Sequence, residues 1–173
     1  LFQHELVGRC DAARRAWQLD GDEAVDWRSV VINRPANVVR KVIASVNRAY
    51  LQIVNTTNEC VIGGQRQAVD TVIGRLGCEA IELPGASTVH CTVARWVQDA
   101  YRELHLLNTT PPDSIRFYSA AQQQSYPVNR VSAADAILAQ AVSGIDFAAT
   151  IEQAYADGVR VFVEAGPQAS CSR

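Results

Sequence analysis

The sequence predicts an α/β (α+β) fold that contains a ferredoxin-like βαββαβ subdomain. Two observations lead to this fold class. First, 48% of the 173 residues are hydrophobic, which is enough to bury one core. Second, residues 27–85 divide into short units whose apolar periodicity alternates between that of a strand and that of a helix. The strands expected outside this region are too few to form a doubly wound sheet by themselves.

The ferredoxin-like region begins with a strand at Ser29–Asn33, and Pro35 suits the first turn of the helix after it. Two further features mark the ends of elements in this region. The polar connection Thr56–Asn58 has the length of a hairpin turn, and Gly77 suits a helix C-terminus. The expected elements are the helix Ala36–Val46, the strands Tyr50–Asn55 and Glu59–Gly63, the helix Gln65–Leu76 and the strand Cys78–Leu83.

The flanking regions carry mainly helical patterns. Residues 1–27 place Leu6, Cys10, Ala13 and Trp17 at helical spacing. The elements expected after the subdomain are the helix Thr92–Leu107, the strand Ile115–Ser119, a surface loop at Gln122–Pro127, the helix Ala133–Val142 capped by Ser132, the helix Asp146–Ala156 and the strand Val159–Glu164. We therefore divide the chain into a helical segment 1–27, a ferredoxin-like small subdomain 28–86 and a C-terminal segment 87–173.

Composition argues against several classes of function. The formal charge of −2, the pI near 5.9 and the absence of a basic cluster predict no nucleic-acid partner. No apolar run is long enough to cross a bilayer, so we expect no membrane association and a cytoplasmic location. The cysteines form no C-x-x-C pair, so we expect no metal site. A chain that starts at Leu1 and has no methionine is expected to be part of a longer polypeptide.

Three ordered groups of residues resemble one enzyme family. They are the hairpin Ile53–Gly64, the segment Glu82–Cys91, and the pair Ala139–Phe147 with Phe162–Pro167. Together they resemble the C-terminal two-thirds of an acyltransferase domain of the malonyl-CoA:acyl-carrier-protein transacylase type, although Thr57 replaces the usual proline of the hairpin. Trp17 and Trp27 look most similar to the acyltransferase domains of polyunsaturated fatty acid and polyketide synthases.

The resemblance implies the C-terminal part of an α/β-hydrolase-like acyltransferase core, and roles for particular residues. His90 would be the catalytic base, presented by a strand and oriented by the backbone carbonyl of Gln140. Residues implied near the substrate are Ser87, Val89, Asn55 and Arg9. A coenzyme A thioester would be the substrate, an acyl carrier protein the partner, and no cofactor would be tightly bound. The acyl group stays open, because Ser87–Val89 match neither specificity pattern of the family.

Some of these residues also have a purely structural interpretation, in which they contact no substrate. Asn55 could equally be a hairpin asparagine that bonds to its own backbone, and Arg9 a solvated helix arginine. Cys91 adjoins His90, but adjacent strand residues point to opposite faces, which argues against a Cys–His nucleophile.

The serine nucleophile of the family sits in a Gly-x-Ser-x-Gly elbow, and the 173 residues contain no such pattern. We expect the chain to be part of an acyltransferase whose serine lies outside it. The alternative is an inactive fragment or a binding module that contacts an acyl carrier protein.

Overall fold

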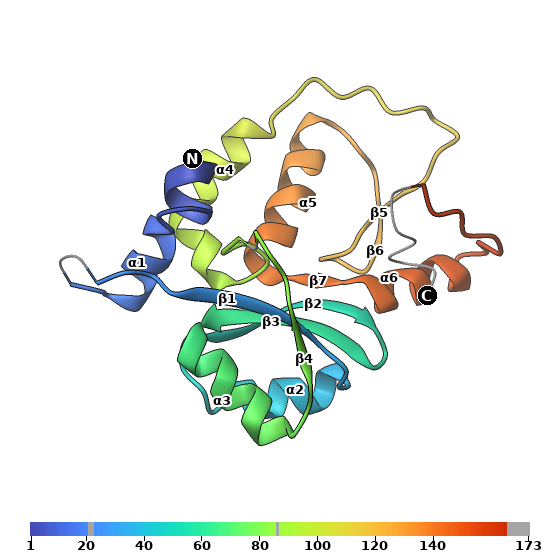
Figure 1. Ribbon diagram of the computed structural model, residues 1–173. Helices are drawn as coiled ribbons and strands as arrows, with labels where there is room; N and C mark the ends of the chain where they lie inside the picture. The colour runs from blue at the N-terminus through green and yellow to red at the C-terminus, as the bar shows by residue number, and fades with distance from the viewer. Residues whose placement is uncertain (21–22, 86, 166–173) are drawn as a thin grey trace.

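A five-stranded sheet separates two helical layers (Figure 1). The structure, a computed structural model, describes residues 1–20, 23–85 and 87–165. The strand order is β4-β1-β3-β2-β7. The strands are β1 (Trp27–Ile32), β2 (Ala49–Thr56), β3 (Glu59–Gln65), β4 (Ala80–Glu82) and β7 (Ile145–Asp146). The first four pair antiparallel in the ferredoxin-like order, whereas β7 joins β2 in parallel.

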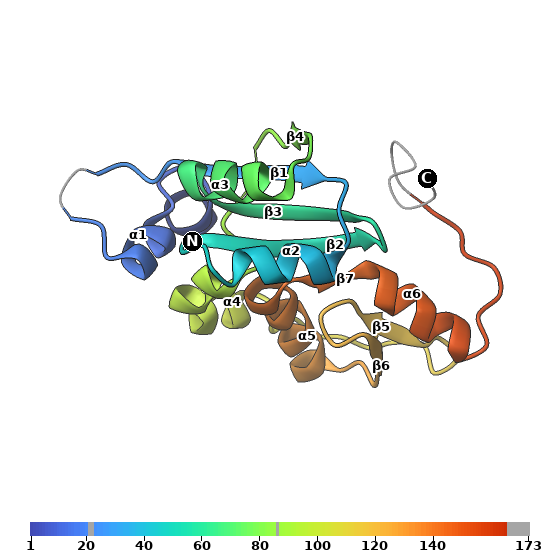
Figure 2. The same cartoon turned by 90° about the horizontal axis from the view of Figure 1, so that it is seen from below.

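Two helices cover one face of this sheet, α2 (Ala36–Ile43) and α3 (Arg66–Leu76), and Figure 2 shows them side by side. Pro35 is the N-cap of α2, because its fixed φ leads into the helix and its missing N–H has no intrahelical partner to lose. Gly77 ends α3 in the left-handed conformation, with φ 55°. The βαββαβ prediction is therefore confirmed, element by element.

The other face carries the N-terminal and C-terminal elements (Figure 1). They are the π-helix η1 (Phe2–Leu6), α1 (Asp11–Trp17), the 3-10 helix η2 (Thr92–Val97), α4 (Gln98–Leu104), α5 (Arg130–Ser143), α6 (Phe147–Ala156) and the hairpin of β5 (Phe117–Ser119) and β6 (Gln124–Tyr126). No helix within the described ranges combines the length and the apolar character that a bilayer crossing requires.

Each layer has its own buried core. Beneath the sheet, valines and isoleucines of β1, β3, α2 and α3 pack together, including Val30, Ile32, Ile62 and Val69. Above it, Leu6, residues of α1 and η2, and Ala141 of α5 form a second cluster with more alanine. Small side chains let helices and loops approach closely in this second cluster. The division of the chain at residues 27/28 and 86/87 stays a prediction.

Four predicted features of the flanking regions are wrong in detail. The first helix is broken, because Cys10 takes a left-handed φ of 52° before α1. The expected loop at Gln122–Pro127 contains β6, whose ladder partner is β5. The helix expected from Thr92 begins as a 3-10 segment and ends at Leu104. Asn129, not Ser132, is the N-cap of α5, and Ser132 is the third residue of the helix, where it completes a capping box with Asn129.

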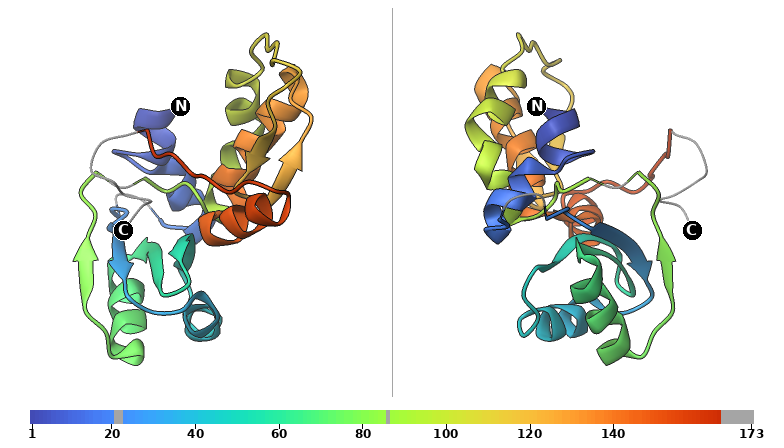
Figure 3. Two further views of the ribbon diagram at one scale, coloured as in Figure 1. Left: turned by 90° about the vertical axis from the view of Figure 1, so that its right-hand side faces the viewer. Right: turned by 60° about the vertical axis from the view of Figure 1, so that its left-hand side comes forward.

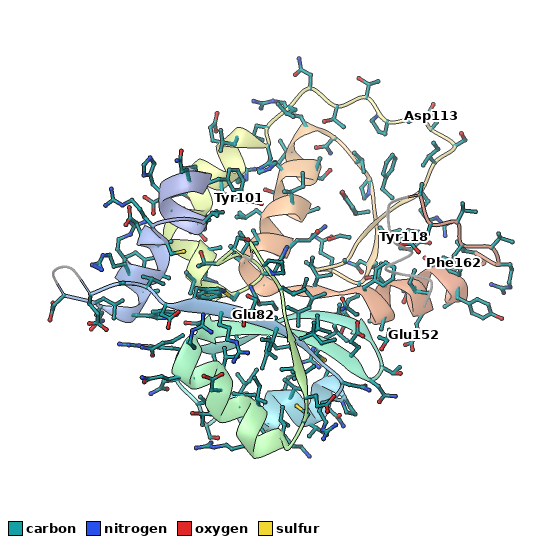
Figure 4. All side chains as sticks on the ribbon, viewed as in Figure 1. Glu82, Tyr101, Asp113, Tyr118, Glu152 and Phe162 are labelled. Atoms are coloured by element: carbon teal, nitrogen blue, oxygen red, sulfur yellow. The ribbon has the colours of Figure 1, made fainter. Side chains whose placement is uncertain are left out.

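The strand expected at Val159–Glu164 is also wrong. This segment has no regular structure, and Val161 and Val163 are 77% and 85% exposed. Figure 4 shows Phe162 on the extended segment after α6, away from the five-stranded sheet. A strand needs a ladder partner for its backbone groups, and no strand in residues 1–20, 23–85 or 87–165 pairs with this one. Gly166 and Pro167 of the matching motif lie outside the described residues.

Candidate active site

The candidate site is centred on the loop 87–91, which connects the sheet to the upper layer. After β4 the chain rises past the edge of the sheet towards the helices (Figure 3). Thr88 fixes the loop to the N-terminal segment, because its N–H and its hydroxyl both donate to Leu6 O, at 2.9 and 3.1 Å. His90 lies in this loop rather than in the strand that the resemblance implied, with a left-handed φ of 61°. That conformation costs a non-glycine residue about 1 kcal/mol, so the surrounding bonds must hold it.

The imidazole of His90 bonds to the backbone of α5. Nδ1 lies 2.9 Å from the carbonyl oxygen of Gln140. A carbonyl oxygen can only accept, so Nδ1 carries the proton and Nε2 of the neutral ring keeps a free lone pair. The next residue repeats the pattern, since the Cys91 N–H donates to Ala141 O at 3.1 Å. The last carbonyls of a helix have no intrahelical partner, so this loop satisfies two groups at the end of α5 and is oriented by them.

Gly144 allows three segments to meet behind His90. It follows α5 with φ 92°. A Cβ on it would lie 2.9 Å from Gln52 O and 3.3 Å from His90 O. The turn after α5, strand β2 and the His90 loop can therefore approach to this distance only around a residue without a side chain.

Gln52 is the residue of this region that the sequence analysis missed. It is only 4% exposed, and its Nε2 donates to the carbonyls of Val89 at 2.7 Å and Ser87 at 3.3 Å. The available signal was a long polar side chain inside the apolar run Leu51–Val54, which is unusual for a strand with a buried face.

The predicted substrate residues are distributed unevenly around His90. Ser87 and Val89 belong to the same loop, and Val89 also packs against the upper core. Asn55 lies near the turn end of β2, where its Nδ2 donates to Glu59 Oε1 at 2.9 Å, instead of bonding to its own backbone. Substrate contact by these residues stays a prediction.

Arg9 lies elsewhere. Its guanidinium is 3.4 Å from Asp11, and its side chain is 70% exposed. It lines a shallow groove together with Gly8, Asp11, Arg14 and residues 23–25, to which the His90 loop contributes nothing. The structure thus brings together His90, Gln140, Ser87 and Val89, but not Arg9.

A small cavity of about 140 Å³ adjoins the site on the side of β2 and the turn after α5. Gln52 and Gly144 line it, together with Arg40, which lies 3.7 Å from Asp146. His90 is not among the lining residues. Across the described ranges, no three His, Cys, Asp or Glu side chains gather in the way a metal ion requires.

Cys91 is unsuited to act as a nucleophile. It is buried, and its Sγ faces Thr88 O at 3.5 Å. Burial raises the pKa of this thiol to about 12, and that of Cys60 to about 11. At pH 8 the Cys91 thiol is therefore protonated, whereas the thiolate is the reactive form.

These thiols predict an alkylation pattern. With iodoacetamide at pH 8, the native chain should be modified at the partly exposed Cys78, while Cys10, Cys60 and Cys91 are spared until urea unfolds it. Peptide mass spectrometry with and without urea checks this. Rapid native modification of Cys91 would contradict the burial described above. Cys171 lies outside the described residues and serves as no control.

Comparisons with known proteins agree with this picture. No protein family model matches the sequence. The chain is 25% identical over 181 aligned residues to one of the subunits of the polyunsaturated fatty acid synthase of a Thraustochytrium species, covering 96% of this chain and 9% of that protein. It is also similar to the solved acyltransferase domain from the second module of the salinomycin polyketide synthase, with a TM-score of 0.70 and 22% identity over 91% of this chain and 37% of that one.

A second solved structure is that of the malonyl CoA-acyl carrier protein transacylase from Clostridium perfringens. Its TM-score is 0.69 and its identity 19%, over 93% of this chain and 52% of that one. The chain thus spans about half or less of the length of these proteins. In fold the chain is similar to the acyltransferase domain of a polyketide synthase and to a malonyl CoA-acyl carrier protein transacylase, and in sequence it is similar to a subunit of a polyunsaturated fatty acid synthase, which confirms the resemblance that its motifs indicate.

Proposed function

We propose that this chain contributes the base of an acyltransferase site, which moves a malonyl or other acyl group from coenzyme A to the phosphopantetheine thiol of an acyl carrier protein. The observation that carries the proposal is the 2.9 Å contact between His90 Nδ1 and Gln140 O, within a fold similar to that of acyltransferase domains. This contact leaves Nε2 as a proton acceptor, the state that a general base must have before reaction.

The proposed reaction needs a serine from outside these 173 residues. His90 Nε2 takes the proton of the serine hydroxyl as its oxygen bonds to the thioester carbonyl carbon. The tetrahedral intermediate then collapses, the bond to the coenzyme A sulfur breaks, and the imidazolium returns the proton to that sulfur. Transfer to the carrier thiol runs through the same steps in reverse. Throughout, Gln140 O holds the Nδ1–H, so that the ring keeps its orientation.

Other residues take supporting roles in the proposal. Ser87 and Val89, next to His90, would border the acyl group, and Asn55 would lie towards the pantetheine arm. The geometry around Arg9 gives no support to a carboxylate-binding role, because its guanidinium pairs with Asp11.

The test uses a longer polypeptide that carries both this chain and a Gly-x-Ser-x-Gly elbow. Incubation with radiolabelled malonyl-CoA should give a base-labile adduct, and His90→Ala should slow its formation by at least about a hundredfold. His105→Ala is the matched control, because His105 Nδ1 also bonds to a backbone carbonyl, that of Tyr101, at 2.7 Å. Undiminished labelling of His90→Ala would refute the assigned role. The 173-residue chain alone should form no adduct. Turnover by it would point to Ser87, or to Cys91 if the burial described above were wrong.

A non-catalytic binding module is the second candidate function. The observation that favours it is the lack of a Gly-x-Ser-x-Gly pattern among the 173 residues. In this case the ferredoxin-like subdomain would contact an acyl carrier protein. Titration of the isotope-labelled chain with such a protein by NMR tests it, and unchanged signals across Gln65–Leu83 would remove this candidate.

A further inference from the structure

A chain of buried and partly buried hydrogen bonds runs from the sheet to the His90 loop. The indole Nε1 of Trp27 donates to Ser29 Oγ at 3.0 Å, and Ser29 Oγ donates to Gln52 Oε1 at 2.8 Å. Gln52 Nε2 then donates to Val89 O at 2.7 Å and to Ser87 O at 3.3 Å. The chain thus starts on β1, passes over β3 to Gln52 of β2 and ends on the backbone immediately before His90.

The direction of each bond is determined by its partners. Two carbonyl oxygens can only accept, so the Gln52 amide must present its NH₂ group to them and its oxygen to Ser29. The indole N–H can only donate, which leaves the Ser29 hydroxyl proton for Gln52. Ser29 and Gln52 are 3% and 4% exposed, so water does not compete for these bonds. The Gln52 amide therefore has a single orientation in which all its partners are satisfied.

Strand β3 provides the space that this arrangement needs. A Cβ on Gly63 would lie 2.1 Å from Gln52 Oε1 and 2.7 Å from Ser29 Oγ. Gly63 also faces both neighbours in the sheet, since it pairs with Ser29 of β1 and with Tyr50 of β2. Because Gly63 has no side chain, Ser29 of β1 and Gln52 of β2 can meet above β3. The sheet is therefore shaped to hold this polar pair.

We propose that Gln52 is a positioning residue for His90. Its NH₂ group holds two carbonyls of the segment 87–89, and this fixes the left-handed backbone of His90 that brings Nδ1 to Gln140 O. Gly144 keeps β2 and the turn after α5 close enough for both contacts to exist. The significance for catalysis rests on the proposed function, whereas the effect on the imidazole does not.

The test reads the imidazole directly by NMR. The chain has three histidines, and His90 and His105 both have Nδ1 on a backbone carbonyl. In proton–nitrogen correlation spectra of the labelled chain, both rings should show the tautomer protonated at Nδ1. In Gln52→Leu, His90 should shift towards the averaged signals of a free imidazole while His105 stays unchanged. His105 is thus an internal control in the same sample.

Hydrogen exchange gives a second reading. The Cys91 N–H, which bonds to Ala141 O, should exchange at least about tenfold faster in Gln52→Leu, while amides of β3 keep their protection. Ser29→Ala, which leaves the Gln52 NH₂ group on its carbonyls, should have a smaller effect on both readings. An unchanged His90 tautomer in Gln52→Leu would overturn the proposal. So would equal changes at His90 and His105, or loss of the fold in both variants, since Gln52 would then only stabilise the sheet.

These readings are independent of acyl transfer. If the His90→Ala labelling experiment fails but the His90 tautomer responds to Gln52→Leu, the proposed function is wrong and the positioning role stands. If labelling depends on His90 but the His90 tautomer is unchanged in Gln52→Leu, only the positioning role is wrong.

Discussion

Gly64→Ala is expected to destabilise the chain by more than about 4 kcal/mol, a large part of the stability of an ordinary domain. Gly64 has φ 150°, and a Cβ on it would lie 2.0 Å from Arg48 O and 3.0 Å from Ala49 Cα. Both are backbone atoms of the segment entering β2, so no side-chain rotation can relieve the overlap. The methyl group would also separate Arg48 O from the Gln65 N–H, which bond at 2.9 Å.

Gly74→Ala is the matched control for this prediction. Gly74 lies inside α3, and a Cβ on it would meet nothing within 4 Å. Alanine in a helix interior is more stable than glycine by about 0.5–1 kcal/mol, so this variant should unfold at higher urea concentration than the original chain. Urea unfolding followed by circular dichroism compares the two. A Gly64→Ala variant as stable as the original would contradict the close approach of β2 and β3.

The ferredoxin-like subdomain could be predicted because its signals are local. Pro35, Gly77 and the hairpin turn mark the ends of elements within a few residues of the chain, and the apolar periodicity identifies what lies between them. By contrast, β7 has two residues, and its ladder partner β2 lies about ninety residues earlier. Such a pairing is set by packing and leaves no periodic pattern.

The segment Val159–Glu164 shows the opposite failure. Its apolar run has the composition of a buried strand, yet a strand forms only where another strand supplies hydrogen-bond partners. Composition indicates whether a segment can be buried. Whether it forms a strand depends on hydrogen-bond partners that are distant in sequence. The strand β6 was missed for the same reason. Its glutamines and the following proline are typical of a loop, whereas its pairing with β5 makes it a strand.

The residues of the candidate site likewise fall into two groups, those that could be paired before the structure was known and those that could not. His90 and Gln140 are fifty residues apart, and they were paired through the resemblance, because periodicity gives no distance between a loop and a helix end. Gln52 and Gly144 could not be paired with them, since their roles depend on the space between three segments. Arg9 was given a substrate-binding role because the N-terminal segment loosely matches the family. In the structure its guanidinium instead pairs with the carboxylate of Asp11.

Trp17→Ala is expected to cost about 3–5 kcal/mol, because it removes a buried aromatic residue that joins α1 to the sheet. Trp17 is 6% exposed and stacks on Trp27 with ring centroids 5.6 Å apart and planes 6° from parallel. Tyr50 also stacks on Trp27, with ring centroids 5.8 Å apart, and its hydroxyl accepts a bond from Trp17 Nε1 at 3.0 Å. Burial raises the pKa of Tyr50, which keeps this hydroxyl neutral.

Trp96→Ala is the matched control, because Trp96 is 56% exposed and should change stability by no more than about 0.5 kcal/mol. Urea unfolding of both variants, with far-ultraviolet circular dichroism to detect the coupling of the stacked indoles, measures the difference. Trp27 also begins the hydrogen-bond chain to Gln52, so loss of its stacking partner should loosen the His90 loop as well. If Trp17→Ala and Trp96→Ala were equally stable, the stack would not hold the N-terminal segment to the sheet, and α1 would have to be retained by the upper core alone.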